Sequence, residues 1–384
     1  MARPFFLFLL IAGLPAWGGP DFAALRSLLK DAVARGTVAG GSVLVIHKGE
    51  RVFGEGFGLA DLEAKTPFGI ETPAVIASIS KPLIGTVAFR LAERGTLDLS
   101  APVSNYLPEF GKLALESGEP VARAPTTIEL LTHTSGLRHD DAPGGRPWFA
   151  SWTAAKPLAE VVNRYASDFP MMARPGTRYA YSGIGTDVAA RVLEVTSGRA
   201  RNSVLAEELT APLGMRHTFY RDAGSLERLP PMPSRYHRGA DGGLLPAKER
   251  RLPPANTYCS SGGAIISTAP DLARWLLMIR NRGRHEGKAF LQPETVVAML
   301  AGAPRGKNAR SGFFIRKRDA GGKAVVVGHT GSSGTNCWID FEHDLIGIML
   351  TQTRGSQIKP FRIELERRVT ACLAGLAPAG SPGN

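Results

Sequence analysis

The hydrophobic positions of this chain follow two rhythms, one typical of buried strands and the other typical of helices. Short, almost continuous apolar runs bounded by turn residues lie near both ends of the chain, a pattern that predicts strands. The predicted strands cover residues 42–47, 51–57, 313–316, 323–328, 335–340 and 346–351. We expect the first two to form a hairpin across Lys48-Gly49-Glu50 and the last four to run antiparallel in succession.

Apolar residues at helical spacing predict helices in the rest of the chain. The predicted helices cover residues 22–33, 158–165, 187–195, 271–279, 295–300 and 362–373. A further helix is expected to begin near Ser78, because Pro82 suits a first turn and Gly95 is a typical stop. Two stretches rich in proline and glycine, 139–152 and 229–254, predict long loops.

Because the predicted strands come from both ends of the chain, its first and last parts are expected to share one sheet, with a mostly helical lobe inserted between them. The predicted fold class is therefore α+β, an antiparallel β-sheet flanked by helices. We expect a single domain over residues 19–373, with a sheet lobe made of 19–95 and 311–373 and a helical lobe made of 96–310. Residues 374–384 are expected to form a flexible tail.

Residues 1–18 have the features of a secretory signal. A basic start at Arg3 is followed by a short apolar run over 5–14 and by small residues at Ala16 and Gly18. The run is too short to span a bilayer. We therefore expect cleavage near Gly18 and a periplasmic or secreted protein with no stable membrane span after cleavage; an uncleaved membrane anchor is the alternative.

Composition limits the partners. The 384 residues are 43% hydrophobic and 21% charged, an ordinary globular balance. The net charge of +12 is scattered, with no basic stripe interleaved with aromatics, so we expect no nucleic-acid partner. The absence of Cys-x-x-Cys and His-Glu-x-x-His patterns predicts no metal and no other cofactor. Cys259, Cys337 and Cys372 leave two alternatives open: one disulfide between an undetermined pair, or three buried thiols.

A serine and a lysine three residues apart carry the candidate chemistry. Ser78 and Lys81 share one face of the predicted helix, about one turn apart. A serine hydroxyl needs a neighbouring base to become a nucleophile, and a desolvated lysine can be that base, as in the Ser-x-x-Lys arrangement of serine acyl-transfer enzymes. The same spacing at Ser27 and Lys30 has no such context and is interpreted as surface helix.

Further motifs follow in order along the chain: His133-Thr134-Ser135-Gly136, Tyr181 after a Pro-Gly turn, and His329-Thr330-Gly331 at the end of an apolar run. Each alone has a structural interpretation, and His133 and Ser135 are interpreted as support for the site rather than as a catalytic pair. In this order, the motifs resemble the class C β-lactamase-like branch of the serine β-lactamase and penicillin-binding-protein superfamily. That branch also contains D,D-carboxypeptidases and family VIII-type esterases. The resemblance covers residues 22–372.

The resemblance implies a role for each matching residue. Ser78 would be the acylated nucleophile, and Lys81 and Tyr181 would form a shared base and proton relay, with the first proton acceptor left open. Backbone N–H groups of Ser78 and Ser332 would form the oxyanion hole. The residues that would bind the substrate are His329, Thr330, Gly331 and Gly183.

Two parts of the predicted site have open interpretations. By the same resemblance, the loop over 139–152, with Trp148 and Trp152, would border the acyl pocket; a plain surface loop is the alternative. An unperturbed histidine titrates near about pH 6.5, so the charge of His329 at neutral pH is also open.

One position departs from the family pattern. The tyrosine motif is usually Tyr-x-Asn, and its third residue here is Gly183. The asparagine normally binds the amide carbonyl of the substrate and helps to orient the lysine, which a glycine side chain cannot do. We therefore expect an exported serine hydrolase that cleaves a small ester, amide or peptide substrate through a Ser78 acyl-enzyme, with esterase-like activity favoured.

Other functions remain open at this level. A D,D-carboxypeptidase or a β-lactamase is the alternative within enzymes, and a non-catalytic binder of cell-wall peptides or of a partner protein is the alternative in another class. The sequence leaves the substrate and the oligomeric state undetermined.

Overall fold

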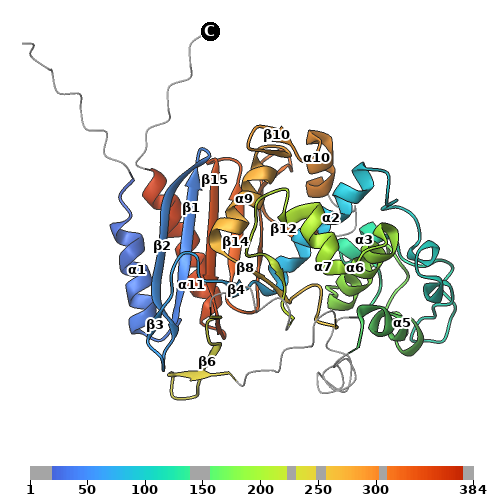
Figure 1. Ribbon diagram of the computed structural model, residues 1–384, viewed down its shortest axis with the longest axis horizontal. Coiled ribbons are helices and arrows are strands. Elements are labelled where there is room, and N and C mark those ends of the chain that lie inside the picture. The colour runs from blue at the N-terminus through green and yellow to red at the C-terminus, as the bar shows by residue number, and fades with distance from the viewer. Residues whose placement is uncertain (1–19, 139–155, 223–230, 248–256, 302–308, 375–384) are drawn as a thin grey trace, which may run out of the picture.

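An antiparallel sheet forms the centre of the protein, as the computed structural model in Figure 1 shows. The structure describes residues 20–138, 156–222, 231–247, 257–301 and 309–374. Within these residues the sheet has eight strands, in the order β11-β12-β13-β14-β15-β1-β2-β3. Their bounds are β1 (Gly40–His47), β2 (Glu50–Asp61), β3 (Thr66–Pro67), β11 (Ala309–Arg310), β12 (Phe313–Arg318), β13 (Ala324–Thr330), β14 (Asn336–Asp340) and β15 (Leu345–Thr351).

The sheet joins the two ends of the chain, because β1 pairs with β2 on one side and with β15 on the other. The predicted hairpin is present, and its turn places Lys48 and Gly49 at φ values of 52° and 87°. The four predicted strands near the C-terminus also pair antiparallel in succession. The predicted fold class, α+β with an antiparallel sheet flanked by helices, is confirmed.

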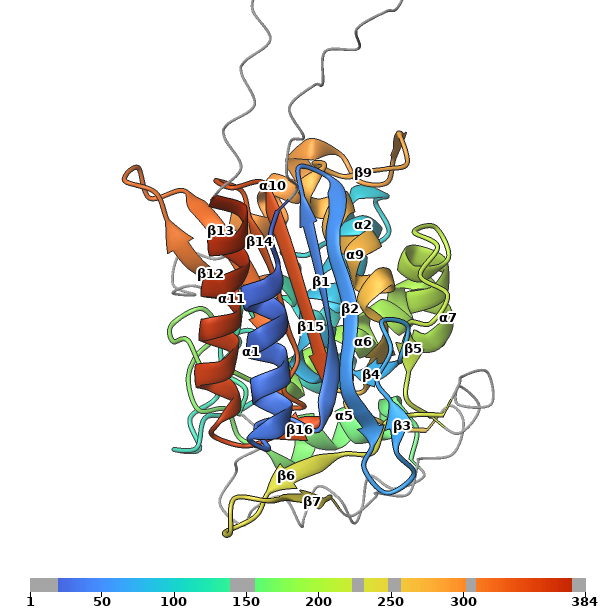
Figure 2. The ribbon, with the colours of Figure 1, turned by 90° about the vertical axis from the view of Figure 1, so that its left-hand side faces the viewer.

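Helices cover both faces of the sheet. In Figure 2, α1 (Ala23–Ala34) and α11 (Ile358–Ala374) lie side by side on one face. The other face packs against α9 (Ala269–Arg280) and, beyond it, α2 (Ser80–Glu93). Because successive side chains of a strand point to opposite faces, β1 contributes alternately to the two cores and is buried along almost its whole length. Burial on both faces explains why this strand reads as a continuous apolar run.

The remaining helices gather at the side of the sheet that α2 faces (Figure 1). They are α3 (Thr127–Leu131), α5 (Leu158–Asp168), α6 (Gly183–Ser197), α7 (Arg201–Leu205) and α10 (Pro293–Ala301). Helix α6 begins at Gly183, four residues before the predicted start, because the Ser182 hydroxyl accepts the Gly185 N–H at 2.9 Å and caps the helix. Helix α11 likewise begins four residues before the predicted start.

Between the two parts of the chain that form the large sheet, the structure contains short strands that were not predicted from the sequence. The predicted loop over 229–254 contains β6 (Tyr236–Arg238) and β7 (Leu244–Pro246), and β6 pairs with β16 (Thr353–Arg354). A second small sheet joins β4 (Ala74–Val75), β8 (Ile265–Ser267) and β5 (Phe219–Tyr220). Strands of two or three residues are too short to show a period of two, and tertiary pairing forms them. The predicted signal over 1–18 and the loop over 139–152 lie outside the described residues.

The cysteines are free thiols. Cys259 and Cys337 are buried, and Cys372 is partly exposed. Of the two alternatives left by the sequence, the structure therefore has thiols and no disulfide among these three residues. Among the described residues, no helix has the length and apolar character needed to cross a bilayer.

Candidate active site

Ser78 lies in the 3₁₀ turn η1 (Ala77–Ile79), which leads directly into α2. The preceding residue, Ala77, has a φ of 49°, in the left-handed region that residues with a Cβ rarely adopt. Such a conformation costs about 1–3 kcal/mol and persists where the surroundings hold it. The Ser80 hydroxyl donates to the Ala77 carbonyl at 2.7 Å. The turn thus places the half-buried Ser78 at the start of α2.

Lys81 is almost completely buried, with 5% of its surface exposed. Its Nζ donates to Ser78 Oγ at 3.3 Å and to the Gly262 carbonyl at 2.8 Å. The first contact follows from the spacing of three residues at the start of a helix. The second comes from a distant part of the chain, just before β8, and the sequence analysis gave no role to that carbonyl.

Tyr181 lies directly before α6, and its ring is beside the lysine. Lys81 Nζ is 4.8 Å from the ring centroid, a distance at which a cation is attracted to an aromatic face. The structure therefore brings together the serine, lysine and tyrosine side chains that the sequence analysis selected. An amine in contact with a hydroxyl and beside the ring of a phenol is placed to take part in proton transfer.

His133 holds the backbone on both sides of Tyr181. Its carbonyl accepts the Ala180 N–H at 2.8 Å, and its Nδ1 accepts the Ser182 N–H at 3.2 Å. The imidazole also packs on the tyrosine, with 4.5 Å between ring centroids. Because Nδ1 accepts a hydrogen bond, the ring proton of a neutral imidazole is on Nε2. His133 therefore positions Tyr181.

His329 lies at the end of β13 and is 2% exposed. Its Nδ1 is 2.7 Å from the Thr330 carbonyl, which can only accept, so Nδ1 carries the proton. Burial lowers the pKa of His329 well below its usual 6.5, and the positive charge of Lys81 lowers it further. A pKa below 6.5 favours the neutral form of this imidazole at neutral pH, the charge that the sequence left open.

The turn that follows β13 is fixed against the nucleophile. Ser333 Oγ donates to the Val75 carbonyl at 2.6 Å, and Thr335 Oγ1 donates to the Ile76 carbonyl at 3.0 Å. Gly331 packs so closely on the Ile76 carbonyl that a Cβ would collide with it. These contacts hold the turn beside η1, directly before Ser78.

The backbone N–H groups of Ser78 and Ser332 donate to no acceptor among the hydrogen bonds of the described residues. Ser332 lies within the turn just described, and its side chain is exposed. Two backbone donors fixed before a reaction begins can stabilise a negative oxygen as it forms. The arrangement fits the pair of donors that the family resemblance implies.

Phe314 on β12 is a neighbour of the site that the sequence analysis did not select. Its ring stacks on Tyr181 with 6.2 Å between centroids and packs on His329 at 4.7 Å. The predicted pairing of the two strands could have identified this residue. Strand β12 pairs with β13, and Phe314 lies opposite Gly328, next to His329. Gly183, at the first position of α6, is buried and leaves the Tyr-x-Asn position without a side chain. Trp148 and Trp152 lie outside the described residues.

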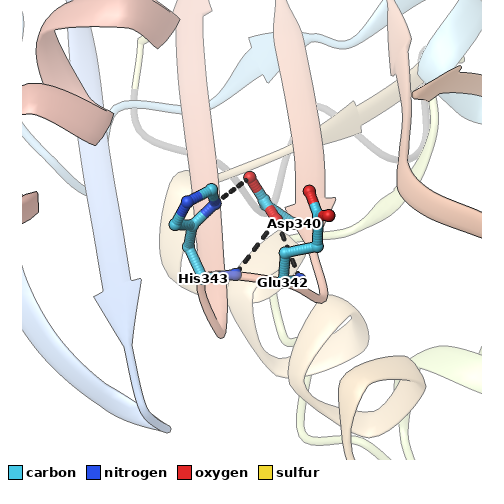
Figure 3. A group of neighbouring side chains, drawn as sticks. All are labelled: Asp340, Glu342 and His343. Carbon is cyan, nitrogen blue, oxygen red and sulfur yellow. Dashed lines mark hydrogen bonds and ion pairs between the residues drawn. The ribbon is translucent and has the colours of Figure 1, made fainter. Parts of the chain in front are cut away.

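A polar cluster outside this site contains Asp340, Glu342 and His343 in the turn between β14 and β15 (Figure 3). Their candidate ligand atoms lie within 4.8 Å of one another. Local contacts account for them: Asp340 accepts the backbone N–H groups of Glu342 and His343 and bonds His343 Nδ1 at 2.8 Å. Glu342 also pairs with Lys317. The expectation that the protein holds no metal stays a prediction.

The fold and the grouped serine, lysine and tyrosine resemble those of serine hydrolases of the β-lactamase-related type. The sequence model of the Beta-lactamase family matches residues 25–371, and the chain belongs to that family. The resemblance predicted from the motifs is confirmed.

Individual proteins show the range of the family. The chain is 30% identical over 263 residues to the D-alanyl-D-alanine-carboxypeptidase/endopeptidase AmpH of Escherichia coli K12, an alignment that covers 67% of this chain and 62% of AmpH. It is 28% identical over 368 residues to the esterase EstB of Burkholderia gladioli, covering 86% of this chain and 90% of EstB. Among solved structures, EstCE1, a hydrolase with promiscuous acyltransferase activity, has a TM-score of 0.77 at 24% identity, covering 90% of this chain and 97% of EstCE1. The likeness to EstCE1 shows a shared fold alone.

Proposed function

We propose that this protein hydrolyses esters through an acyl-enzyme formed on Ser78. The observation that carries the proposal is the contact of Lys81 Nζ with Ser78 Oγ at 3.3 Å, beside the ring of Tyr181. A hydroxyl in contact with a buried amine can lose its proton as it attacks a carbonyl carbon. Resemblance to the esterase EstB along most of both chains supports the same class of reaction.

The proposed reaction has two halves. Ser78 Oγ forms a bond to the carbonyl carbon while its proton passes to Lys81 or Tyr181, and the N–H groups of Ser78 and Ser332 stabilise the resulting oxyanion. The bond to the leaving alcohol then breaks, and the alcohol oxygen takes up the proton. Water attacks the acyl-enzyme by the same route and returns the hydrogen to Ser78 Oγ, releasing the acid.

Two features favour an ester without a carboxylate over a peptide substrate. Gly183 offers no side-chain amide to bind a substrate carbonyl. His329, at the end of β13, is neutral at neutral pH because burial lowers its pKa. It therefore offers no cation to the terminal carboxylate of a peptide. A D,D-carboxypeptidase is the second candidate, supported by the 30% identity to AmpH.

The test compares turnover of short-chain p-nitrophenyl esters by the wild type, S78A and S27A. Ser27 is an exposed residue of α1 with the same spacing to a lysine, so S27A is a matched control. We expect S78A to lower kcat by about 10³-fold or more and S27A to leave it unchanged. Equal ester turnover by the wild type and S78A would contradict the proposal.

The same assay separates the alternatives. A penicillin that labels Ser78 and is released slowly, with little ester turnover, would favour the carboxypeptidase. A protein that no serine-directed phosphonate labels would favour the non-catalytic binder. Mass spectrometry of the intact protein identifies each adduct, and S78A is the blank in every case.

We also propose that the protein is exported and that residues 1–18 are removed. The support is the basic start, short apolar run and small residues described above. The intact mass of protein recovered from the periplasm or the medium is expected to match a chain that begins near residue 19. A full-length chain retained in the membrane fraction would contradict this.

A further inference from the structure

A buried carboxyl group on α6 contacts the backbone segment that carries the Gly262 carbonyl, the acceptor of Lys81. Asp187 is 1% exposed and six residues beyond Tyr181. Its Oδ1 accepts the Ser261 N–H at 2.6 Å, and its Oδ2 accepts the Tyr258 hydroxyl at 2.8 Å. The Tyr165 hydroxyl, from α5, is 3.3 Å from the same oxygen. Asp187 thus fixes the segment that leads into Gly262.

That segment is held from a second side by Arg201, the first residue of α7, which is 7% exposed. Its guanidinium donates to the Cys259 carbonyl at 2.6 Å and to the Thr257 carbonyl at 2.7 Å. One buried side chain therefore binds the carbonyls of the segment while Asp187 binds its N–H and hydroxyl donors. The backbone between these two anchors is therefore held by hydrogen bonds to both of them.

The fixed segment ends at the group that Lys81 contacts. Gly262 directly follows Ser261, and its carbonyl accepts Lys81 Nζ at 2.8 Å. A shift of the Ser261 backbone would therefore move the acceptor of the lysine. The contact matters in this chain because the Tyr-x-Asn position is occupied by Gly183, which has no side chain with which to orient the amine.

We propose that Asp187 is a positioning residue for catalysis: through Ser261 it sets the Gly262 carbonyl, and through that carbonyl it holds Lys81 against Ser78. The inference rests on the proposed function of the serine and lysine. It adds that α6 serves both proton-transfer groups, since Tyr181 precedes its first turn and Asp187 lies in its second.

The test replaces Asp187 by asparagine, which keeps the size and removes one of the two acceptor oxygens. We expect D187N to lower kcat for a p-nitrophenyl ester by about 10- to 100-fold, since misplacing a reacting group by about 1 Å costs about 100-fold. KM should stay within about twofold, because Asp187 does not touch the substrate in this proposal.

Asp271 provides a matched control. It is 4% exposed, lies in the first turn of α9, and accepts the His217 N–H at 2.7 Å and the Thr218 hydroxyl at 2.8 Å, but it has no described bond to the 257–262 segment. D271N is therefore expected to lower the melting temperature and leave kcat unchanged. Equal kcat losses in D187N and D271N would overturn the inference, since both would then reflect loss of stability alone.

Y258F is the second variant, used in case D187N does not fold. It removes a single hydroxyl from Asp187 and keeps the ring. A fall in the kcat of Y258F at constant KM supports the inference. The inference is overturned if Y258F has the wild-type kcat and D187N is folded and fully active. If D187N does not fold, a wild-type kcat in Y258F alone overturns it. The proposed function fails separately, if the wild type and S78A turn over the ester equally.

Discussion

Space for the amine of Lys81 depends on a hydrogen atom at residue 262. A Cβ on Gly262 would lie 2.9 Å from Lys81 Nζ and 3.2 Å from the Thr186 Cβ. Because Lys81 is almost completely buried, making room would displace its amine from the position in which it contacts Ser78. We predict that G262A lowers kcat for an ester by about 100-fold while the protein remains folded, measured by steady-state kinetics and circular dichroism.

The neighbouring glycine is the control for that prediction. A Cβ on Gly263 would meet its nearest atom, Ser260 Oγ, at 3.9 Å, an ordinary contact. G263A should therefore keep the wild-type kcat. If G262A and G263A have the same kcat, the packing argument for Gly262 is wrong.

His329 gives the protein a pH-dependent stability that can be measured. Burial, and then the charge of Lys81, lower the pKa of His329 well below 6.5. As the pH falls through about 6.5 the unfolded chain binds a proton that the folded chain does not, so this group lowers stability on acidification and contributes little slope above about pH 7.5.

We therefore predict that H329N, which keeps an N–H donor near the Thr330 carbonyl, loses less stability on acidification than the wild type. Melting temperatures measured from about pH 8 down to about pH 5 should fall less steeply in H329N. H237N, at an exposed histidine, is the reference for loss of one imidazole. Parallel curves for the wild type and H329N would contradict the prediction.

The site residues differ in how far the sequence alone could predict them. Ser78 and Lys81 lie about one turn apart in one helical segment, so their contact follows from their spacing. Tyr181 and His329 were selected by motif, although only the folded chain brings them together. The roles of Gly262 and Asp187 could not be predicted, because a backbone carbonyl and a buried carboxyl act there through contacts between distant segments.

At the scale of elements, helix α2 packs closely on the turn before β12 at Gly85. Gly85 packs on the Ser311 carbonyl, in the turn before β12, so closely that a Cβ would overlap the oxygen. The same turn is bound to α3 by the Gly312 N–H, which donates to the Leu131 carbonyl at 3.1 Å. The turn is therefore not free to move away from α2.

We predict that G85A lowers the free energy of unfolding by about 1–3 kcal/mol, the usual cost of overpacking a core. G111A is the control, since a Cβ on Gly111 would have no neighbour within 4 Å. Urea unfolding of both variants measures the effect. An unchanged free energy of unfolding in G85A would show that α2 can shift without cost.

Helices and strands could be predicted from the sequence where burial produces a pattern of apolar residues that extends over many positions. Strand β1 is buried on both faces and α9 is buried around most of its surface, and each has a pattern long enough to recognise. The start of α6 was missed because its cap, the Ser182 hydroxyl, acts through one hydrogen bond. Strands β6 and β7 were missed because pairing, rather than pattern, makes them.

At the scale of the whole molecule, the sheet separates two hydrophobic cores, of which only one lies on the side of the candidate site. The core under α1 and α11 includes Leu365 and Trp338, whereas the helices that carry the candidate site pack on the opposite face. Because both chain ends contribute strands and helices to the first core, it stabilises the fold without touching Ser78 or Lys81. We therefore expect that substitutions of residues in the first core change stability without changing catalysis.

This separation predicts the behaviour of substitutions in α11. Leu365 is fully buried and Ile363 is 60% exposed, only two residues apart. L365A should lower the free energy of unfolding by about 2–5 kcal/mol because it leaves a cavity, and I363A should change it by no more than about 0.5 kcal/mol. Both variants should keep the wild-type kcat at temperatures where they are folded. A loss of kcat in folded L365A would mean that the two cores are coupled through the sheet.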